Sequence, residues 1–396
     1  MRSGLISGAL GSPSSSLLVV SASVFIVMLG TGIVAPILPL YAASFATSYS
    51  VIGIVVALFA VARIFTNLPA GSLADRFGRK PVIMIGMAVF GLGALIAAFA
   101  TNIYYLAVSR LIQGIGAALY TTTALVFVSD IAPASQRGRY MSSFQGSFTL
   151  GIAIGPAIGG FLTELGGFRA PFLALMVMAL LGTVFSGIKI RESLQVSRQT
   201  KISLQELKQV LKETMTKRNL LILGYTSAAL TTLVSGIRFT AIPLYGEQIA
   251  KFSPSQIGTV LGVSATVGFL ALRLTGSMID RYGSKPMLVS GFLIAAASSY
   301  AFILTQNLYL FIAVAIFLSL AEAMANPAQA AAVIGETDVT HRGLALGVNR
   351  IFFDLGIFSG PLIVGVFSDY YGLFSPFVAI SVLCVFTTII AFATLK

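Results

Sequence analysis

Residues 71–81 read GSLADRFGRKP, and the phrase returns 205 positions later as GSMIDRYGSKP at residues 276–286. Two further pairs keep the same offset: residues 150–156 (LGIAIGP) with residues 355–361 (LGIFSGP), and Arg137-Gly138 with Arg342-Gly343. Three matches at one offset predict a chain made of two homologous halves. Each charged phrase stands between long apolar stretches.

The composition places these halves in a membrane. Hydrophobic residues make up 57% of the chain and charged residues only 10%, and the mean hydropathy is +0.94. A soluble protein cannot bury that much apolar surface. Apolar runs of about 20 residues can cross a bilayer, and they must be helical because lipid offers backbone groups no partners. Two duplicated hydrophobic halves are typical of secondary transporters that rock one half against the other.

The apolar runs predict an all-α membrane protein with twelve transmembrane helices in two homologous six-helix bundles around a central cavity. The spans are expected near 17–41, 50–72, 81–101, 104–128, 141–164, 170–188, 220–244, 254–277, 286–304, 308–333, 344–367 and 376–394. The predicted domains are an N-terminal bundle (1–188), a cytoplasmic basic linker (189–219) and a C-terminal bundle (220–396). The linker has a weak helical stripe, which predicts either a surface amphipathic helix or a regulatory docking site.

The basic residues fix an orientation. With these spans, most of the 25 Lys and Arg residues fall on one side of the membrane. Only Arg169 and Lys251 fall on the other side. The crowded side is expected to be cytoplasmic, with both termini there, in a multi-pass protein of the plasma (inner) membrane. The net charge of +12 is therefore explained without a nucleic-acid partner. We expect no cleaved signal peptide.

The loop between spans 2 and 3 can act as a cytoplasmic latch. Residues 71–80 are expected to form a turn, in which Gly71 allows helices to approach and Gly78 permits the reversal. Asp75 can lie at the N-terminus of another helix, and Arg79 can pair with Asp130 at the end of span 4. Such contacts can form in one conformation and break in another. The alternative is a plain turn with positive-inside charge.

A stripe of small residues marks span 5. Gly151, Gly155 and Gly159 recur every four residues, so they lie on one helix face. Such stripes let membrane helices pack backbone to backbone, and Pro156 bends the helix. The stripe is expected to be a sliding or sealing surface between the halves; plain tight packing is the alternative.

These motifs together resemble the major facilitator superfamily and, within it, the drug:proton antiporters with twelve spans. The likeness covers essentially the whole chain. Four segments carry it: 29–39 (LGTGIVAPILP) in span 1, 71–81 in the loop between spans 2 and 3, 110–116 (RLIQGIG) in span 4 and 151–160 (GIAIGPAIGG) in span 5.

The resemblance implies roles for particular residues. It implies a cavity formed mainly by spans 1, 4, 7 and 10, and a proton-transfer role for Arg110. The implied latch comprises Gly71, Asp75, Arg76, Gly78, Arg79 and Asp130, with Asp280 in the second copy. The implied antiporter motif comprises Gly151, Gly155, Pro156, Gly159 and Gly160. The second half departs from the pattern, because Ser284 stands where Arg79 would repeat and Val364 where Gly159 would.

Seven ionisable residues fall inside the predicted spans: Arg63, Arg110, Arg238, Arg273, Arg350, Glu322 and Asp354. Each is costly near the middle of a membrane helix, so each needs a partner or water. Glu322 lies about 20 Å along span 10, near the midplane. A carboxylate there can take up and release a proton if it meets each aqueous side in turn. The alternative is a structural pair with an arginine, for which Arg238 is a candidate.

Three other polar groups are candidates for the same pathway. Asp354 follows Arg350 by one turn, which favours a structural pair and leaves a coupling role open. Arg110 and Gln113 are expected to form a hydrogen-bonded pair facing the cavity. Candidate cavity-lining residues are Gln113, Tyr120, Tyr225, Arg238 and Phe239; for the aromatic ones the alternative is packing between helices or contact with lipid. We therefore assign proton coupling to Glu322, Asp354 and Arg110.

Several classes of chemistry are not expected. One Cys, one His and scattered acids give no metal site. No phosphate-binding loop with Lys-Ser/Thr occurs, so ATP is not expected to drive the protein directly. We expect no cofactor and no enzymatic activity. The expected partners are a small-molecule substrate, protons and the lipid bilayer, and the protein is expected to be a monomer.

The sequence thus predicts a proton-coupled antiporter that exports small, mostly apolar organic compounds. The first alternative is a transporter of one specific polar or anionic metabolite, such as a sugar or an organic anion, because arginines outnumber acids inside the spans. The second is a membrane sensor or scaffold that transports nothing.

Overall fold

The fold is described from a computed structural model, in which residues 13–45, 48–133, 136–190, 192–193, 218–337 and 342–395 are described. Within these ranges the chain is helical and contains no strand. The N-terminal part has α1 (Pro13–Val34), α2 (Ile37–Ala43), α3 (Tyr49–Phe77), α4 (Arg79–Ala98), α5 (Ile103–Ile131), α6 (Arg137–Gly166) and α7 (Arg169–Lys189). The C-terminal part has α9 (Arg218–Leu233), η2 (Val234–Ala241), α10 (Ile242–Gln248), α11 (Pro254–Tyr282), α12 (Ser284–Ala301), η3 (Phe302–Leu304), α13 (Leu308–Gly335), α14 (Arg342–Tyr371) and α15 (Ser375–Thr394).

Twelve helical segments in the described part of the chain are long and apolar enough to cross a membrane, from Leu17–Ala43 to Ser375–Thr394. They match the twelve predicted spans one for one, so the predicted all-α membrane class is confirmed. Most of the predicted linker, residues 194–217, lies outside the described residues, and so does His341. The predicted helical stripe of the linker therefore stays a prediction.

Span 1 is interrupted. It was predicted as one helix over residues 17–41, but α1 ends at Val34 and α2 begins at Ile37. Pro36 lies at the break, where its ring removes a backbone donor and disfavours helix continuation. Hydroxyls inside α1 bond back to the preceding turn, as Thr31 Oγ1 does to the Val27 carbonyl at 2.9 Å.

The predicted turn over residues 71–80 is wrong in extent. Helix α3 continues to Phe77 and α4 begins at Arg79, so the reversal takes place at Gly78 alone, whose φ is +99°. Helix formation continues because Ala70 and Ala74, one turn apart, are fully buried against Val82 and Leu119. Among the described residues, no atom lies within 4 Å of a Cβ built on Gly71, so the close helix approach there stays a prediction.

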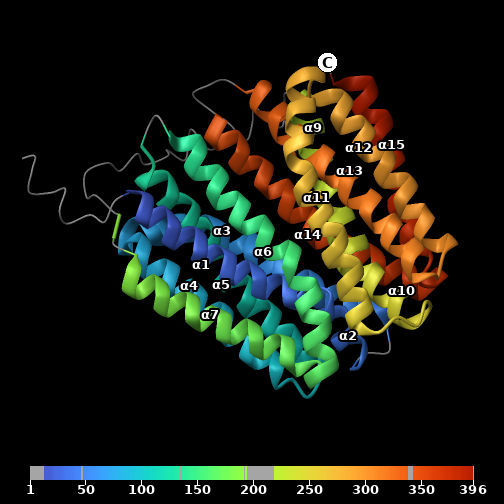
Figure 1. Ribbon diagram of the computed structural model, residues 1–396, viewed down its shortest axis with the longest axis horizontal. Helices are drawn as coiled ribbons and strands as arrows, with labels where there is room; N and C mark the ends of the chain where they lie inside the picture. The colour runs from blue at the N-terminus through green and yellow to red at the C-terminus, as the bar shows by residue number, and fades with distance from the viewer. Residues whose placement is uncertain are drawn as a thin grey trace, which may run out of the picture. The chain divides into compact units, whose positions relative to one another are not determined.

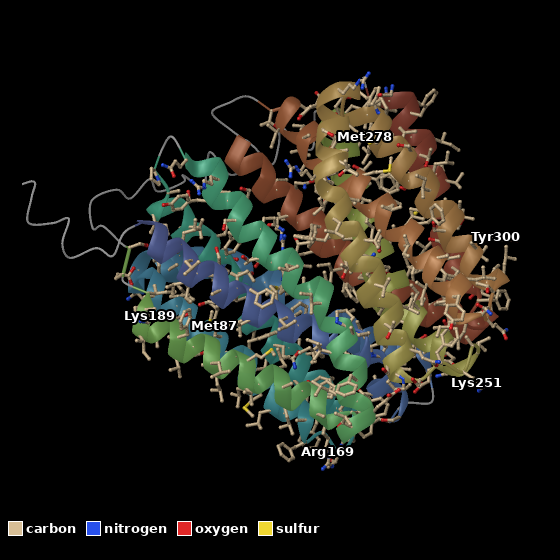
Figure 2. All side chains as sticks on the ribbon, viewed as in Figure 1. Met87, Arg169, Lys189, Lys251, Met278 and Tyr300 are labelled. Carbon is tan, nitrogen blue, oxygen red and sulfur yellow. The ribbon has the colours of Figure 1, made fainter. Side chains whose placement is uncertain are left out.

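Contacts within the chain define two compact units, which we describe separately. The first comprises residues 1–34, 61–155 and 165–199, and in it α4 packs against α5 and α7, and α1 against α7 (Figure 1). Figure 2 shows Arg169 and Lys189 at opposite ends of α7, so the charges flank its apolar length. Only six residues of this helix are buried, because it lies at the edge of the unit.

The second unit comprises residues 35–60, 156–164 and 200–396. In it α13 packs against α11 and α12, α15 against α12, and α14 against α9 and η2 (Figure 1). In Figure 2, Lys251 lies just before the start of α11 and Met278 lies near its other end. The first residues of α3 and the last turns of α6 belong to this unit although they come from the first sequence repeat. The predicted domain boundaries at 188 and 220 remain a prediction.

Candidate functional site

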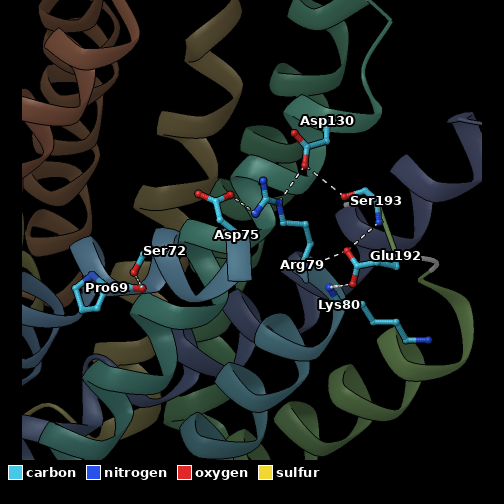
Figure 3. A network of polar contacts seen from close by, with 8 residues as sticks. All are labelled: Pro69, Ser72, Asp75, Arg79, Lys80, Asp130, Glu192 and Ser193. Carbon is cyan, nitrogen blue, oxygen red and sulfur yellow. Dashed lines mark hydrogen bonds and ion pairs between the residues drawn. The ribbon is translucent and has the colours of Figure 1, made fainter. Parts of the chain in front are cut away.

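An ion network closes the turn between α3 and α4 (Figure 3). The guanidinium of Arg79 lies 2.5 Å from an oxygen of Asp75 and 3.1 Å from an oxygen of Asp130 at the end of α5. Arg79 is buried, with 8% of its surface exposed. The predicted Arg79–Asp130 pair is therefore confirmed. We call Asp75, Arg79, Asp130 and Glu192 the latch network.

Glu192 belongs to this network although the sequence did not indicate it. One of its carboxylate oxygens accepts the backbone N–H of Arg79 at 2.8 Å, and the other accepts that of Lys80 at 3.1 Å. These are free donors of the first turn of α4, where a carboxylate is also favoured by the helix dipole. A Cβ on Gly78 would lie 2.5 Å from the same carboxylate. The start of the linker is therefore fastened to the turn at Gly78 (Figure 3).

The second copy of the phrase keeps the backbone turn and loses the arginine that makes the ion pairs. Helix α11 ends at Tyr282, Gly283 has a φ of +89°, and α12 begins at Ser284. Ser284 cannot supply the guanidinium that Arg79 supplies. In the described part of the chain, no ion pair is made by Asp280, so the predicted latch role of that residue stays a prediction.

Glu322 lies in the middle of α13 with 7% of its surface exposed. An oxygen of its carboxylate lies 3.0 Å from the Arg238 guanidinium, and Arg238 also donates a hydrogen bond to Ser319 Oγ. The predicted Arg238–Glu322 pair is confirmed. We call Arg238, Ser319 and Glu322 the intramembrane ion pair.

Arg238 is carried by a π-helical segment that the sequence analysis missed. In η2 the backbone N–H of Ile242 bonds to the Ile237 carbonyl, and Thr240 Oγ1 bonds to the Ser235 carbonyl at 2.8 Å, both five residues back. Pro243 follows at the start of α10 and cannot fit a normal α-turn, so a wider turn before it relieves the clash. Pro243 was the available sequence signal.

The intramembrane ion pair has an unused acceptor. Glu322 Oε1 is buried and has no hydrogen-bond partner among the described residues. Buried polar atoms are nearly always satisfied, so such an atom indicates a bound water, a proton or a ligand group. Glu322 can therefore exchange a proton or accept a donor from a substrate while its second oxygen holds Arg238.

A second polar group lies in α5. Arg110 donates a hydrogen bond of 2.6 Å to Gln113 Oε1, as predicted, and Gln113 is fully buried. The amide nitrogen of Gln113 and the hydroxyl of Tyr120 are buried without a partner among the described residues. These two groups can bind a polar ligand or water. That they line a cavity stays a prediction.

The other predicted site residues lie in α9, η2 and α14. Tyr225 shares a hydrogen bond of 3.1 Å with Thr387, and Phe239 is half-buried in η2. Asp354 is buried in α14, with 1% of its surface exposed. The Arg350 guanidinium lies 4.1 Å over the Phe353 ring. Their roles in coupling or substrate binding remain predictions.

Glycines of α6 pack against two different helices. A Cβ on Gly151 or Gly155 would collide with the backbone of α1, at Leu29 and at Gly32. Gly160, the residue after the stripe, meets the backbone of Pro254 at the start of α11. The equivalent residues of α14, Gly356 and Gly360, pack in the same way against α9 and η2. Close packing is confirmed, and a sliding role stays a prediction.

Twelve spans, a duplicated pattern and a buried ion pair whose arginine lies in a π-helical turn are typical of a polytopic membrane transporter. The sequence matches the Major Facilitator Superfamily over residues 20–276 and again over 225–396. The chain belongs to that family.

Curated relatives cover nearly the whole chain. Multidrug resistance protein 2 of Bacillus subtilis is 27% identical over 380 residues, which is 92% of each chain. The quinolone resistance protein NorA of Staphylococcus aureus is 26% identical over 359 residues, covering 88% of this chain and 89% of NorA. The relatives of this transporter therefore include drug-resistance proteins.

Solved structures share the fold. A bacterial homologue of the human lysosomal transporter Spinster superposes with a TM-score of 0.82 at 17% identity and 96% coverage of both chains. The D-xylose-proton symporter gives 0.79 at 17% identity and 98% coverage of both. The human organic anion transporter MFSD10 gives 0.71 at 19% identity, covering 96% of this chain and all of that one. The protein is a multi-pass membrane transporter of a small-molecule substrate.

Proposed function

We propose that the protein exports small, mostly apolar organic compounds in exchange for protons. The observation that carries this proposal is the intramembrane ion pair, in which buried Glu322 holds Arg238 with one oxygen and has the other unpartnered. The names of the relatives from Bacillus subtilis and Staphylococcus aureus support the substrate class. The basic side is proposed to be cytoplasmic, with both termini there.

Proton coupling follows from the chemistry of this pair. When Glu322 gains a proton, it loses its charge and with it most of its attraction for Arg238. When it loses the proton, the pair reforms or a substrate donor takes its place. If proton and substrate compete for Glu322, the carboxylate holds only one of them at a time. One then crosses in each half of the cycle, which is the condition for antiport. Arg110 and Asp354 are proposed to tune the same cycle.

Glu322→Gln tests the proposal because the amide keeps the shape but cannot ionise. In proteoliposomes with an imposed pH gradient, we expect uphill export to fall by about a hundredfold or more, to background, while substrate affinity stays within about threefold. Exchange of labelled for unlabelled substrate at equal pH should continue. Uphill transport retained by the variant would remove Glu322 from the coupling step.

Glu247→Gln is the matched control. Glu247 lies in α10, at the far end of the span that carries Arg238, and the substitution makes the same chemical change outside the ion pair. Its transport should equal that of the parent protein. A general loss in both variants would indicate damage to the fold rather than to coupling.

A specific polar or anionic substrate is the second candidate. Five of the seven ionisable residues inside the predicted spans are arginines, and an excess of buried cations favours an anion. A panel of organic cations, organic anions and sugars in the same vesicles separates the candidates. Gradient-driven flux of one anion or sugar alone would replace the drug proposal. Tight binding of a ligand without any flux would favour a sensor.

A further inference from the structure

A carboxylate from α14 covers the start of α3. Asp369 accepts three hydrogen bonds: from Ser48 Oγ at 2.6 Å, from the Tyr49 N–H at 2.7 Å and from the Ser50 N–H at 2.8 Å. The first backbone donors of a helix have no partner within the helix, and an acid placed there is further favoured by the dipole. Asp369 thus acts as the N-terminal cap of α3, a role that is more often filled by the residue directly before a helix.

The equivalent acid of the other repeat makes the equivalent contact. Glu164 stands 205 positions before Asp369, and Ser255 stands 205 positions after Ser50. An oxygen of Glu164 accepts the Ser255 N–H at the start of α11, at 3.2 Å. The same type of contact, between a carboxylate and the start of a helix, therefore occurs twice, at corresponding positions of the duplicated sequence.

Glycines bring the same two helix pairs together next to each cap. A Cβ on Gly53 or Gly365 would collide with backbone at Pro361 and at Tyr49, respectively, across the α3–α14 contact. Gly258 and Gly160 repeat this arrangement across the α11–α6 contact, against Pro156 and Pro254. All these residues belong to the second compact unit. Each contact joins one helix of the first sequence repeat to one helix of the second.

The two caps differ in strength for a local reason. Helix α11 caps itself, because Ser253 Oγ accepts the Gln256 N–H and the Gln256 side chain accepts the Ser253 N–H. Glu164 adds only one bond to a helix end that is already satisfied. In α3 the corresponding serine, Ser48, donates to Asp369 instead. The first turn of α3 therefore depends on a residue 320 positions away.

We propose that Asp369 and Glu164 are positioning residues of the transport cycle, which hold the start of α3 to the end of α14 and the end of α6 to the start of α11. The charge bias places these ends on the outer side. The inference rests on the proposed alternating access, because opening that side must separate helices of the two repeats and break both caps. Asp369 is the stronger of the two, so its removal shifts the protein toward outward opening.

Accessibility of a buried cysteine tests this proposal. Ala57 is 1% exposed and lies one turn after Gly53 on the same face of α3. The full-length variant Ala57→Cys, with Cys384→Ser to remove the native thiol, is reacted in proteoliposomes with a membrane-impermeant maleimide from the outer side. Adding Asp369→Asn should raise the labelling rate about tenfold, and adding Glu164→Gln by about twofold or less. Asp369→Glu keeps the acceptor and should return the rate close to that of the parent.

Two outcomes would overturn the proposal. One is a labelling rate in Asp369→Asn within about twofold of the parent. The other is an equal increase in the Glu164→Gln variant. Cys384 is fully buried in α15 and reports on unfolding. Its reaction with a permeant maleimide, in variants that retain it, must stay slow, because a loosened bundle would expose every thiol. Labelling needs neither substrate nor a pH gradient, so it can fail or succeed independently of the transport test of Glu322.

Discussion

The two copies of the duplicated loop differ in what holds them. In the first, Arg79 lies between Asp75 and Asp130, and Glu192 caps the helix that follows. In the second, the glycine turn is kept at Gly283, but Ser284 replaces the arginine. The backbone turn therefore needs only glycine, whereas the arginine and its ion pairs are present in the first copy alone among the described residues. Charges that the turn does not require are the ones free to serve a switch.

Among changes in the two copies of the loop, Arg79→Ala is expected to have the largest effect. It leaves the carboxylates of Asp75 and Asp130 without their shared cation, and breaking a buried pair costs more than an exposed one. We expect the initial rate of substrate transport to fall about tenfold, since the latch network no longer favours one conformation. Ser284→Ala is the matched change in the second copy and should leave the rate unchanged. Equal losses in both variants would contradict a one-sided latch.

The variants Asp75→Asn and Asp280→Asn carry the same substitution at equivalent positions of the two copies, so their effects can be compared directly. Asp75 accepts from Arg79, but its side chain is 65% exposed, so water screens the pair and the effect should be smaller. We expect the rate of conformational exchange, followed by spin-label distances, to change about threefold for Asp75→Asn. Asp280→Asn should change nothing measurable. An unchanged Asp75→Asn variant would remove this residue from the latch.

Glu192→Ala removes the cap of α4 without touching the ion pairs of Arg79. Loss of a helix cap costs about 1 kcal/mol, so the thermal midpoint of the purified protein should fall by a few degrees at most. Glu192→Gln keeps an oxygen acceptor, so its thermal midpoint should fall by less than half as much as that of Glu192→Ala. If transport rates also fall in Glu192→Ala while the midpoint stays the same, the residue acts on the switch rather than on stability.

The sequence predicted most of the fold because bilayer length and backbone pairing leave few choices. Twelve spans follow from apolar runs alone. The Arg79–Asp130 and Arg238–Glu322 pairs could be anticipated because each buried charge demands a partner. What could not be predicted depends on distant chain segments or on turn geometry. Glu192 caps a turn more than 110 positions away, and Asp369 caps one 320 positions away.

The π segment shows the same limit on a local scale. Pro243 indicates a disturbance in span 7, but the sequence does not say whether the helix kinks, breaks or widens. The structure shows a wider turn over Val234–Ala241 that carries Arg238. The misplaced turn at residues 71–80 has a related cause. The predicted span ended near residue 72, but the buried face of Ala70 and Ala74 continues the helix.

Ser284→Arg should give the smallest effect and tests the comparison from the opposite side. An arginine at this position would follow Asp280 by four residues, the spacing at which Arg79 follows Asp75. On an exposed helix end such a pair contributes only about 0.3 kcal/mol, which corresponds to a shift of about 1 °C or less. A double-mutant cycle with Asp280→Asn, measured at low and high salt, isolates the pair. The new arginine would have Asp280 as a partner but no equivalents of Asp130 and Glu192. Transport should therefore stay unchanged. A slower transporter would mean that a single arginine suffices to make a latch, so the difference between the copies would lie in that residue alone.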